Sequence, residues 1–554
     1  MSFVIKIMQN SRLEVETGIN NCLLISDSHN SDLTSLTKHA LGFLEQQLAN
    51  QDMRRVLIVS DIEGDELVCD MFYKNLKNVC RSNSVNEIVL LGSELCAQNQ
   101  RFKIEKKHCF LTTDDFLKSE IINSFKNKAI LLKIAPEFSP EKVQMYLQLL
   151  PHDTTLEIDF DAMLHNINYF RSKLKADTKL MCMVKASAYG SGSVEVALAM
   201  QHYGCDYLGV AFANEGVELR QGGIEMPIMV LNPMLPALHH LFEYRLEPEI
   251  CSFRMLKAVA DFAKDLGVKN YPVHIKIDTG MHRAGFENQD ISKIIDFFNS
   301  QDELKICSVF SHLAAADEDT PEMNNFTIQQ INLFEKITAT LEKSISYKFF
   351  KHILNTAGIE RFSEYQFDMV RLGIGLWGFL EQGTKSKEQR QEAVISTNGR
   401  NLVPEAESKQ ILIPHSSFLI PKLKNVCSLS TKIIQIKNVT AGQSIGYGRK
   451  GRAEQDKKIA LLPLGYADGI NRKLSNGTGF MLINGKKAPI IGNICMDLLM
   501  LDVTGMSVKE GDKVVVFNAE RPFSTIAEQL DTIPYEVLTA ISPRVRRVYF
   551  SENM

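Results

Sequence analysis

LMCMVKASAYG, residues 180–190, is the stretch that decides the fold of this chain. Its apolar half, 180–184, predicts a buried strand that delivers Lys185 to its C-terminal tip, and a turn of small residues follows. A barrel of parallel strands builds its active site at such tips, and a lysine held there can serve as a Schiff-base amine. Lys185 is therefore the leading catalytic candidate.

The apolar run that ends at Lys185 is one of eight similar runs, most of them separated by segments of helical periodicity. The runs are 179–185, 206–210, 227–231, 246–250, 272–278, 305–312, 350–355 and 368–373. Eight β/α repeats in succession predict a (β/α)8 barrel over residues 154–382. Distinctive polar residues follow these runs at their C-terminal ends, where barrel enzymes place their sites: Lys185, Asn232, Asp278, His312, Asn355 and Arg371.

Two further regions flank the predicted barrel. Residues 1–150 alternate short apolar strands (21–25, 55–60, 87–91 and 129–134) with helical patterns, including one over 33–48, which predicts a Rossmann-like α/β domain. Residues 383–422 are mostly polar and predict a solvated insertion or linker. Residues 423–554 predict a C-terminal β domain with strands at 429–436, 458–463, 480–483, 490–494, 498–503 and 513–517, and a hairpin turn at Asn484-Gly485.

Composition narrows the functional class. The chain has 554 residues, a formal net charge of −4 and 23% charged residues, values that argue against nucleic acid or an anionic membrane as the main partner. The eleven cysteines are scattered and form no C-x-x-C pair, so neither a disulfide framework nor a metal site is expected. No secretion signal or membrane-spanning run is recognisable, and we expect a cytoplasmic protein.

From about residue 154 onward the chain resembles alanine racemase, a fold-type III enzyme that uses pyridoxal 5'-phosphate. The resemblance rests on motifs that occur in the family's order: 184–190, with Ser187 where asparagine is usual; 276–283; Ser311-His312; 352–356, with Thr356 where serine is usual; 371–374; 465–469; 495–497; and 535–537. It implies interconversion of L- and D-alanine, which supplies D-alanine for peptidoglycan synthesis.

The resemblance also assigns roles. Lys185 and Tyr466 are implied to be the two bases, one on each face of the substrate, as racemisation by direct proton transfer requires. A free tyrosine has a pKa of about 10 and needs a neighbour to act as a base; the family supplies one at His312, supported by Arg371. Tyr466 and Met496 are implied to reach into the barrel of a second copy, so an obligate homodimer is expected.

Further cofactor and substrate contacts follow from the same resemblance. Arg371 is implied to face the pyridine nitrogen, and an arginine keeps its proton, so that nitrogen stays unprotonated. Arg283 is implied to clamp the substrate carboxylate or to order Tyr466, and Met496 is implied to lie at the substrate. Lys276 is a candidate for carbamylation. The remaining implied cofactor contacts are Tyr189, His312, Asn355, Thr356, Gly373, Ile374 and Tyr535.

Residues 1–150 resemble the C-terminal domain of the Mur ligase that adds D-alanyl-D-alanine to the peptidoglycan precursor. The turn at 27–31 and the segment Lys133-Ile134-Ala135-Pro136 carry this resemblance. No G-x-x-x-x-G-K-[ST] loop or shorter Gly-Lys-Thr variant occurs, so nothing in the chain is expected to hold ATP phosphates. We interpret residues 1–150 as a ligase remnant without ligase activity, or as a module that docks a Mur ligase partner.

Two competing functions remain open. A decarboxylase acting on basic amino acids would share the barrel and β domain, but it would show a glycine-rich phosphate loop and a Cys-Glu substrate turn. Here Cys495 precedes Met496 and Asp497, and no triple-glycine loop occurs. A cell-wall assembly scaffold, recruiting ligases through residues 1–150, is the second alternative and is compatible with racemase activity.

Overall fold

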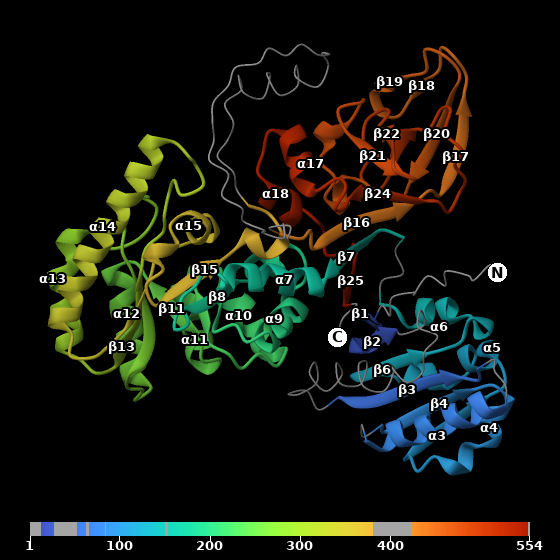
Figure 1. The fold of residues 1–554 in the computed structure, drawn as a ribbon, viewed down its shortest axis with the longest axis horizontal. Coiled ribbons are helices and arrows are strands. Elements are labelled where there is room, and N and C mark those ends of the chain that lie inside the picture. Colours follow the sequence, from blue (N-terminus) through green and yellow to red (C-terminus); the bar gives the residue numbers. More distant parts are fainter. Residues whose placement is uncertain are drawn as a thin grey trace, which may run out of the picture. The chain divides into compact units, whose positions relative to one another are not determined.

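The computed structural model describes residues 13–26, 53–62, 66–82, 85–149, 153–380 and 423–551 (Figure 1). The chain forms two compact units. The first comprises 1–164, 184–226 and 425–554, and the second comprises 165–183 and 227–424. The helical pattern at 33–48, the turn at 27–31 and the polar segment 383–422 lie essentially outside the described residues. Within those residues, no helix is long and apolar enough to cross a membrane.

The N-terminal region is an α/β layer built on parallel strands. Its strands are β2 (Leu23–Ser26), β6 (Lys128–Lys133), β3 (Arg54–Ser60), β4 (Glu87–Leu91) and β5 (Lys106–Phe110), hydrogen-bonded in that order, with β1 (Leu13–Thr17) antiparallel to β2. Its α-helices are α3 (Glu66–Ser82), α4 (Ser93–Ala97), α5 (Thr113–Leu117) and α6 (Pro140–Leu147). The strands expected here are confirmed to within two residues at each end.

Strand alternation in this region buries both faces of the sheet. Leu57 and Val59 of β3 pack with α3 in one apolar cluster. Val56 and Ile58, on the opposite face, pack with α5 and α6 in another. Side chains of successive strand residues point to opposite faces, so a continuous apolar run is what a two-faced sheet needs.

The sheet of the N-terminal region continues into strands from later parts of the first unit. Its twelve strands run β22-β21-β24-β16-β7-β25-β1-β2-β6-β3-β4-β5. The joining strands are β7 (Thr155–Asp159), parallel to the C-terminal strand β25 (Arg546–Ser551), and β1, antiparallel to β25. Strands from the beginning, middle and end of the chain therefore share one hydrogen-bonded sheet.

The predicted barrel is a parallel sheet of eight strands, nearly closed. Its order is β14-β13-β12-β11-β10-β9-β8-β15. The strands are β8 (Lys179–Met183), β9 (Tyr207–Val210), β10 (Ile228–Val230), β11 (Glu247–Ile250), β12 (Tyr271–Lys276), β13 (Leu304–Phe310), β14 (Phe350–His352) and β15 (Met369–Leu372). Each lies within one of the eight predicted runs, except that β12 and β13 begin one residue earlier.

Helices follow the barrel strands, as a parallel sheet requires for its crossovers. They are α7 (Phe160–Arg171), the short α8 (Lys185–Tyr189), α9 (Ser193–His202), α10 (Ala213–Gln221), α11 (Leu238–Glu243), α12 (Phe253–Asp265), α13 (Ile291–Asn299), α14 (Pro321–Ser344) and α15 (Thr356–Arg361). α15 starts directly after β14, with the Asn355 side chain accepting a hydrogen bond from the Gly358 N–H at 2.9 Å as its N-cap.

The C-terminal region is rich in strands, and two expectations for it need correction. The run 429–436 is divided between β16 (Cys427–Lys432) and β17 (Gln435–Val439), which belong to different sheets. Residues 490–494 form no strand, because Gly492 has a φ of +74° and only Ile490 makes an isolated bridge. The hairpin is confirmed: Asn484 and Gly485 both have positive φ between antiparallel neighbours.

The remaining elements of the C-terminal region are β18 (Ser444–Ile445), β19 (Gly451–Arg452), β20 (Lys457–Leu462), β21 (Phe480–Ile483), β22 (Lys486–Pro489), β23 (Leu499–Asp502), β24 (Lys513–Phe517), α17 (Phe523–Leu530) and α18 (Pro534–Thr539). The expected strands at 458–463, 480–483, 498–503 and 513–517 correspond to β20, β21, β23 and β24. Short single-turn 3-10 helices connect several of them.

Candidate active site

Lys185 stands at the entrance to a left-handed turn. Strand β8 stops at Met183, two residues before the lysine, and α8 is not a right-handed helix: Ala186, Ser187 and Ala188 have φ of 48–54° and ψ of 51–54°. The left-handed conformation costs an L-residue roughly 1–2 kcal/mol. Such strain persists only where the surroundings enforce it, and it is typical of functional sites.

The enforcing contacts come from two neighbouring helices. The Glu215 carboxylate of α10 accepts hydrogen bonds from the backbone N–H of Ala186 at 2.7 Å and of Ala211 at 2.6 Å. At the end of the turn, a Cβ added to Gly190 would lie 2.5 Å from the Leu538 carbonyl oxygen of α18. The turn is therefore fixed at both ends, and Lys185 is presented from a rigid backbone.

Arg371, on β15, carries a buried guanidinium with a nearly complete set of acceptors. Nη1 donates to His352 Nδ1 at 2.6 Å, and Nη2 donates to the carbonyl oxygens of Ser311 at 2.7 Å and Ile353 at 3.1 Å. Nη2 also contacts His312 Nδ1 at 3.3 Å. Among the described residues, the Nε–H of Arg371 has no hydrogen-bond partner and remains able to donate. Burial lowers the pKa of Arg371 to about 10, so the group stays cationic at neutral pH.

The geometry around Arg371 assigns the tautomers of two histidines. A guanidinium can only donate, so Nδ1 of His352 and Nδ1 of His312 must both accept. Each neutral ring then carries its proton on Nε2. Burial and the nearby Arg371 lower the pKa of His352 well below its usual value, which keeps that ring neutral.

Several predicted phosphate contacts converge after β14 and β15. The Thr356 hydroxyl oxygen accepts a hydrogen bond from the Gly373 N–H at 2.9 Å. Among the described residues the hydroxyl proton has no acceptor, so it can be donated to an anion. Gly375 cannot carry a side chain, because a Cβ there would lie 2.5 Å from the Phe170 ring. Ile374 is buried at the start of the following 3-10 turn. Asn355 uses its side chain to cap α15, which is a structural role.

Tyr189 and Tyr535 lie close together in the first unit. Their ring centroids are 5.7 Å apart at an angle of 39°. Tyr189 ends the left-handed turn that begins at Lys185, and Tyr535 is in the first turn of α18. Two phenol hydroxyls are thus held beside the lysine-bearing turn, as phosphate recognition by hydroxyl donors needs.

Tyr466 projects from a tightly braced turn. The backbone N–H of Tyr466 donates to the Cys495 carbonyl at 3.0 Å, and that of Ala467 donates to the Met496 carbonyl at 3.0 Å. A Cβ on Gly465 would lie 2.2 Å from the Met496 oxygen, so only glycine fits there. The Tyr466 side chain is 44% exposed and Met496 is 54% exposed.

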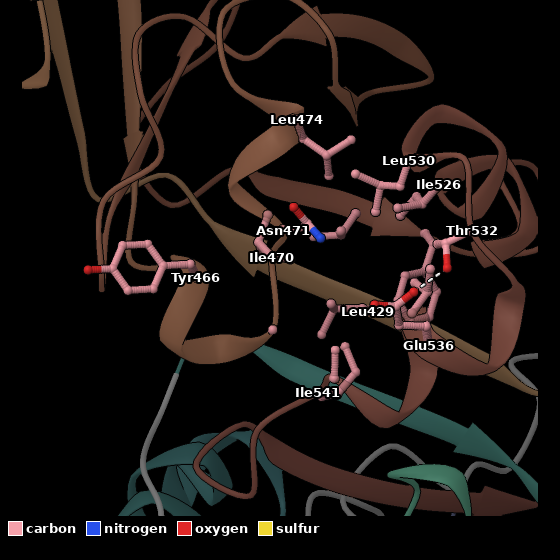
Figure 2. A pocket seen from close by; sticks show the side chains of 15 residues that line it. Leu429, Tyr466, Ile470, Asn471, Leu474, Ile526, Leu530, Thr532, Glu536 and Ile541 are labelled. Carbon is pink, nitrogen blue, oxygen red and sulfur yellow. Dashed lines mark hydrogen bonds between the residues drawn. The ribbon is translucent and has the colours of Figure 1, made fainter. Parts of the chain in front are cut away.

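A buried carboxylate completes the brace. Asp468 is fully buried; one oxygen accepts the Gly465 N–H at 2.7 Å and the other accepts Arg544 Nε at 2.6 Å. Arg544 also pairs with Asp497 at 2.8 Å, which gives Asp497 a structural role. Figure 2 shows Tyr466 at the edge of an apolar cavity of about 240 Å³, with its ring directed away from the other lining side chains.

Lys276 does not lie unpaired beside Arg283. Its Nζ is 3.2 Å and 3.4 Å from the two carboxylate oxygens of Glu249, on the neighbouring strand β11. Burial raises the pKa of Glu249 to about 7, although Lys276 and Arg283 both favour its charged form. Arg283 is exposed and makes no hydrogen bond within the described part of the chain, so its guanidinium is available for a carboxylate.

The predicted residues fall into two groups. The second unit holds Arg371, His312, Thr356, Gly373, Ile374, Lys276 and Arg283, and the first holds Lys185, Tyr189, Tyr535, Tyr466 and Met496. Sequence reasoning missed Glu215, Glu249 and Asp468. Glu249 lies near the end of a predicted strand, where a search for acids could have found it. Asp468 lies inside the 465–469 motif, which assigned it no role, and Glu215 acts on backbone N–H groups and belongs to no motif.

Comparison with known proteins covers both groups of residues. Residues 158–381 match the alanine racemase N-terminal domain family, and residues 426–549 match the alanine racemase C-terminal domain family. The chain is 34% identical to alanine racemase 1 of Oceanobacillus iheyensis over 407 residues, 72% of this chain and 98% of that protein. It is 35% identical to the alanine racemase of Halothermothrix orenii, over 72% and 96% of the two chains.

The chain belongs to the alanine racemase family. Solved structures agree: the alanine racemase of Clostridium difficile 630 superposes with a TM-score of 0.61 and 32% identity, covering 72% of this chain and 96% of that one. The alanine racemase of Bartonella henselae, solved with covalently bound pyridoxal phosphate, gives a TM-score of 0.60 and 27% identity over 72% and 100% of the two chains. Residues before 158 lie outside both family matches.

Proposed function

We propose that this alanine racemase family member interconverts L- and D-alanine with pyridoxal phosphate bound through Lys185. The observation that carries the proposal is the lysine held on an enforced left-handed turn after β8; in the other unit, the buried Arg371 keeps an N–H that can donate. The expected decarboxylase features are absent from the sequence, and both family matches favour the racemase.

The residues present fit this cofactor. A phosphate dianion needs donors, and the Thr356 hydroxyl, the Gly373 and Ile374 region and the phenols of Tyr189 and Tyr535 would supply them. The Arg371 Nε–H would face the ring nitrogen and keep it unprotonated. When bound, pyridoxal phosphate acts as an electron sink that makes the Cα–H of an amino acid acidic.

The chain's own residues then move the protons. The Lys185 amine would remove or return the Cα proton on one face, and the Tyr466 phenol would do so on the other. His312 accepts from Arg371 at Nδ1, so its ring proton is on Nε2, which can donate. A donor directed at the Tyr466 oxygen would stabilise the phenolate, which is the form that can accept a proton.

A homodimer is part of the proposal. Tyr466 and Met496 are exposed, although the Tyr466 turn is fixed by the Asp468 brace, so a rigidly aimed phenol would meet the barrel of a second copy. Activity should decrease as the protein is diluted below its dimer dissociation constant. Full activity from a stable monomer, measured with gel filtration, would contradict this arrangement.

Substrate recognition is proposed for Arg283, with support from Glu249 and Lys276. An exposed guanidinium binds a carboxylate through paired N–H donors. Carbamylation of Lys276 stays a prediction, but Glu249 already places a carboxylate beside the ammonium group and near Arg283. We propose that Glu249 supplies the negative charge that carbamylation would otherwise provide.

Trapping the cofactor tests the proposal. Protein reconstituted with pyridoxal phosphate and reduced with borohydride should yield a single modified peptide containing Lys185, and the unreduced protein should convert L-alanine to D-alanine. Lys185→Ala should abolish both, whereas Lys175→Ala, an exposed lysine upstream of β8, should change neither. Adduct formation at another lysine would overturn the assignment.

For residues 1–150 we propose a ligase-derived domain of Rossmann-like layering that lacks ligase activity and docks a Mur ligase partner. Its parallel β2-β6-β3-β4-β5 core fits the Rossmann-like layering expected of that ligase's C-terminal domain, and the missing phosphate loop argues against catalysis. Pull-down with the full chain, compared with a chain lacking 1–150, should separate a scaffold role from a structural one. The eleven cysteines are scattered in the sequence and form no C-x-x-C pair, so we also propose a cytoplasmic location.

A further inference from the structure

A continuous hydrogen-bond chain crosses the interior of the barrel from Arg371 to the start of β11. It runs from Arg371 Nη1 to His352 Nδ1 (2.6 Å), from His352 Nε2 to Ser308 Oγ (2.8 Å), from Ser308 Oγ to His274 Nδ1 (2.7 Å) and from His274 Nε2 to Glu247 Oε2 (2.9 Å). These five residues come from β15, β14, β13, β12 and β11.

Burial makes this chain a fixed part of the structure. Ser308, His352 and His274 are fully buried, Arg371 is 4% exposed, and only the Glu247 side chain, at 14%, approaches solvent. A buried polar group left without a partner costs about 1–3 kcal/mol, so each link is strongly favoured. Barrel interiors are ordinarily filled by branched apolar residues, and a polar chain through one requires an explanation.

With both imidazole rings neutral and Glu247 ionised, only one direction of donation satisfies every link. Arg371 cannot accept, so His352 accepts at Nδ1 and carries its proton on Nε2. That proton is donated to Ser308 Oγ, whose own proton must then go to His274 Nδ1. His274 is left with its proton on Nε2, which it donates to the Glu247 carboxylate. The chain therefore runs from cation to anion with no ambiguous link.

With this direction of donation, His274 offers no ring-nitrogen lone pair to a metal ion at the far end. Ligand atoms of Glu247, His274 and Cys307 lie within 4.8 Å of one another, a donor set that could suit zinc. A histidine binds a metal through a ring nitrogen lone pair. Here Nδ1 accepts the Ser308 hydroxyl proton and Nε2 carries a proton of its own, so His274 has no lone pair to offer.

We propose that Glu247 and His274 are positioning residues for Arg371. Acting through Ser308, they hold His352 in the Nε2–H tautomer, and the fixed His352 acceptor orients the guanidinium so that its Nε–H faces the cofactor ring. The inference rests on the proposed function only for the identity of that ring. The direction of the hydrogen-bond chain is a property of the protein itself.

The proposal is tested by exchanging the acceptor at the Glu247 end of the hydrogen-bond chain for a donor. Glu247→Gln keeps an acceptor oxygen for His274 and should leave the cofactor dissociation constant unchanged. Glu247→Lys presents a donor instead, so the direction of donation conflicts with Arg371 and cofactor binding should weaken roughly 10- to 100-fold. Ser308→Ala disconnects the two ends, so adding Glu247→Lys to Ser308→Ala should cause little further loss, as a double-mutant cycle would show.

Nitrogen-15 NMR of histidine-labelled, cofactor-free protein gives a readout independent of activity. His352 and His274 should both show an unprotonated Nδ1 and a protonated Nε2, with assignments from His352→Gln and His274→Gln. A protonated Nδ1 on either ring, or an equal effect of Glu247→Lys with and without Ser308, would overturn the inference. If the expected tautomers are seen but no cofactor binds, the proposed function fails and the direction of the chain stands.

Discussion

We expect the unfolding free energy of Glu249→Gln, relative to that of the wild type, to be larger at neutral pH than at acid pH. The pKa of Glu249 is about 7 in the folded protein against an ordinary 4.5, because burial disfavours the carboxylate more than Lys276 favours it. One pKa unit corresponds to 1.36 kcal/mol, so ionising this group costs the folded state about 3 kcal/mol.

The sign of the pH dependence follows from proton binding. Below pH 4.5 the carboxyl is protonated in both states, and no cost exists. Between pH 4.5 and 7 the unfolded chain releases the proton first, so the folded state loses stability as the pH rises. Glutamine does not titrate, and the stability of Glu249→Gln minus that of the wild type should therefore increase by about 3 kcal/mol over this interval.

The chain offers a specific probe for the measurement. Trp377 is its single tryptophan, is fully buried and lies in the same unit as Glu249. Urea unfolding of the cofactor-free protein, followed by tryptophan fluorescence from pH 4.5 to 8, should report on this unit. Glu243→Gln, an exposed carboxylate on α11, is the matched control and should show no pH-dependent difference. A constant gap between Glu249→Gln and wild type would refute the reasoning.

Three further outcomes are expected. Tyr466→Phe should lower kcat by roughly 10²- to 10⁴-fold without changing the cofactor absorption spectrum, which separates loss of a base from loss of binding. Ser187→Asn should raise thermal stability by up to about 1 kcal/mol, measured by circular dichroism, because asparagine tolerates the left-handed backbone at that position. In bicarbonate buffer, Glu249→Gln should gain the mass of one CO₂ at Lys276, while the wild type shows none; a carbamate in the wild type would count against Glu249 as its substitute.

The barrel strands could be predicted because their signal is local. An apolar run bounded by polar or small residues marks a buried parallel strand without information from elsewhere in the chain. The predicted strand ends are less accurate: Lys185 is expected at the end of a strand, but the strand stops at Met183. The left-handed turn that follows depends on the Glu215 carboxylate and on the Leu538 carbonyl beside Gly190, which no local pattern reveals.

The same limit explains the misassigned strand at 490–494. Its apolar residues match strand propensity, but their backbone groups are used otherwise: Ile490 donates to Gly479, Ile491 to Met500 and Ile494 to the Ser475 hydroxyl. The interior polar residues escaped prediction for a related reason. Glu247, His274 and Ser308 alternate with apolar neighbours, and alternation alone indicates a solvent-facing side rather than a polar barrel interior.

The N-terminal region pairs with the last strand of the family-matched region. A strand at the edge of a sheet exposes unpaired N–H and C=O groups that favour aggregation. β25 is the last strand of the family-matched region. One edge of β25 pairs with β7, and the other edge pairs with Leu13 to Val15 of β1. The two regions therefore share main-chain hydrogen bonds across this boundary.

A buried carboxylate fixes the register of that junction. Glu16 is 3% exposed and accepts hydrogen bonds from the side chains of Gln144 and Gln148, each at 2.8 Å. Its second oxygen is 3.5 Å from Arg546 of β25, which also bonds Thr155 of β7. A chain lacking residues 1–150 would lose both the Glu16 contact to Arg546 and the cover on β25, while Arg546 would keep its bonds to Thr155. The N-terminal region therefore supplies main-chain and side-chain bonds to the sheet of the family-matched part of the chain, which is a structural use that does not depend on its origin.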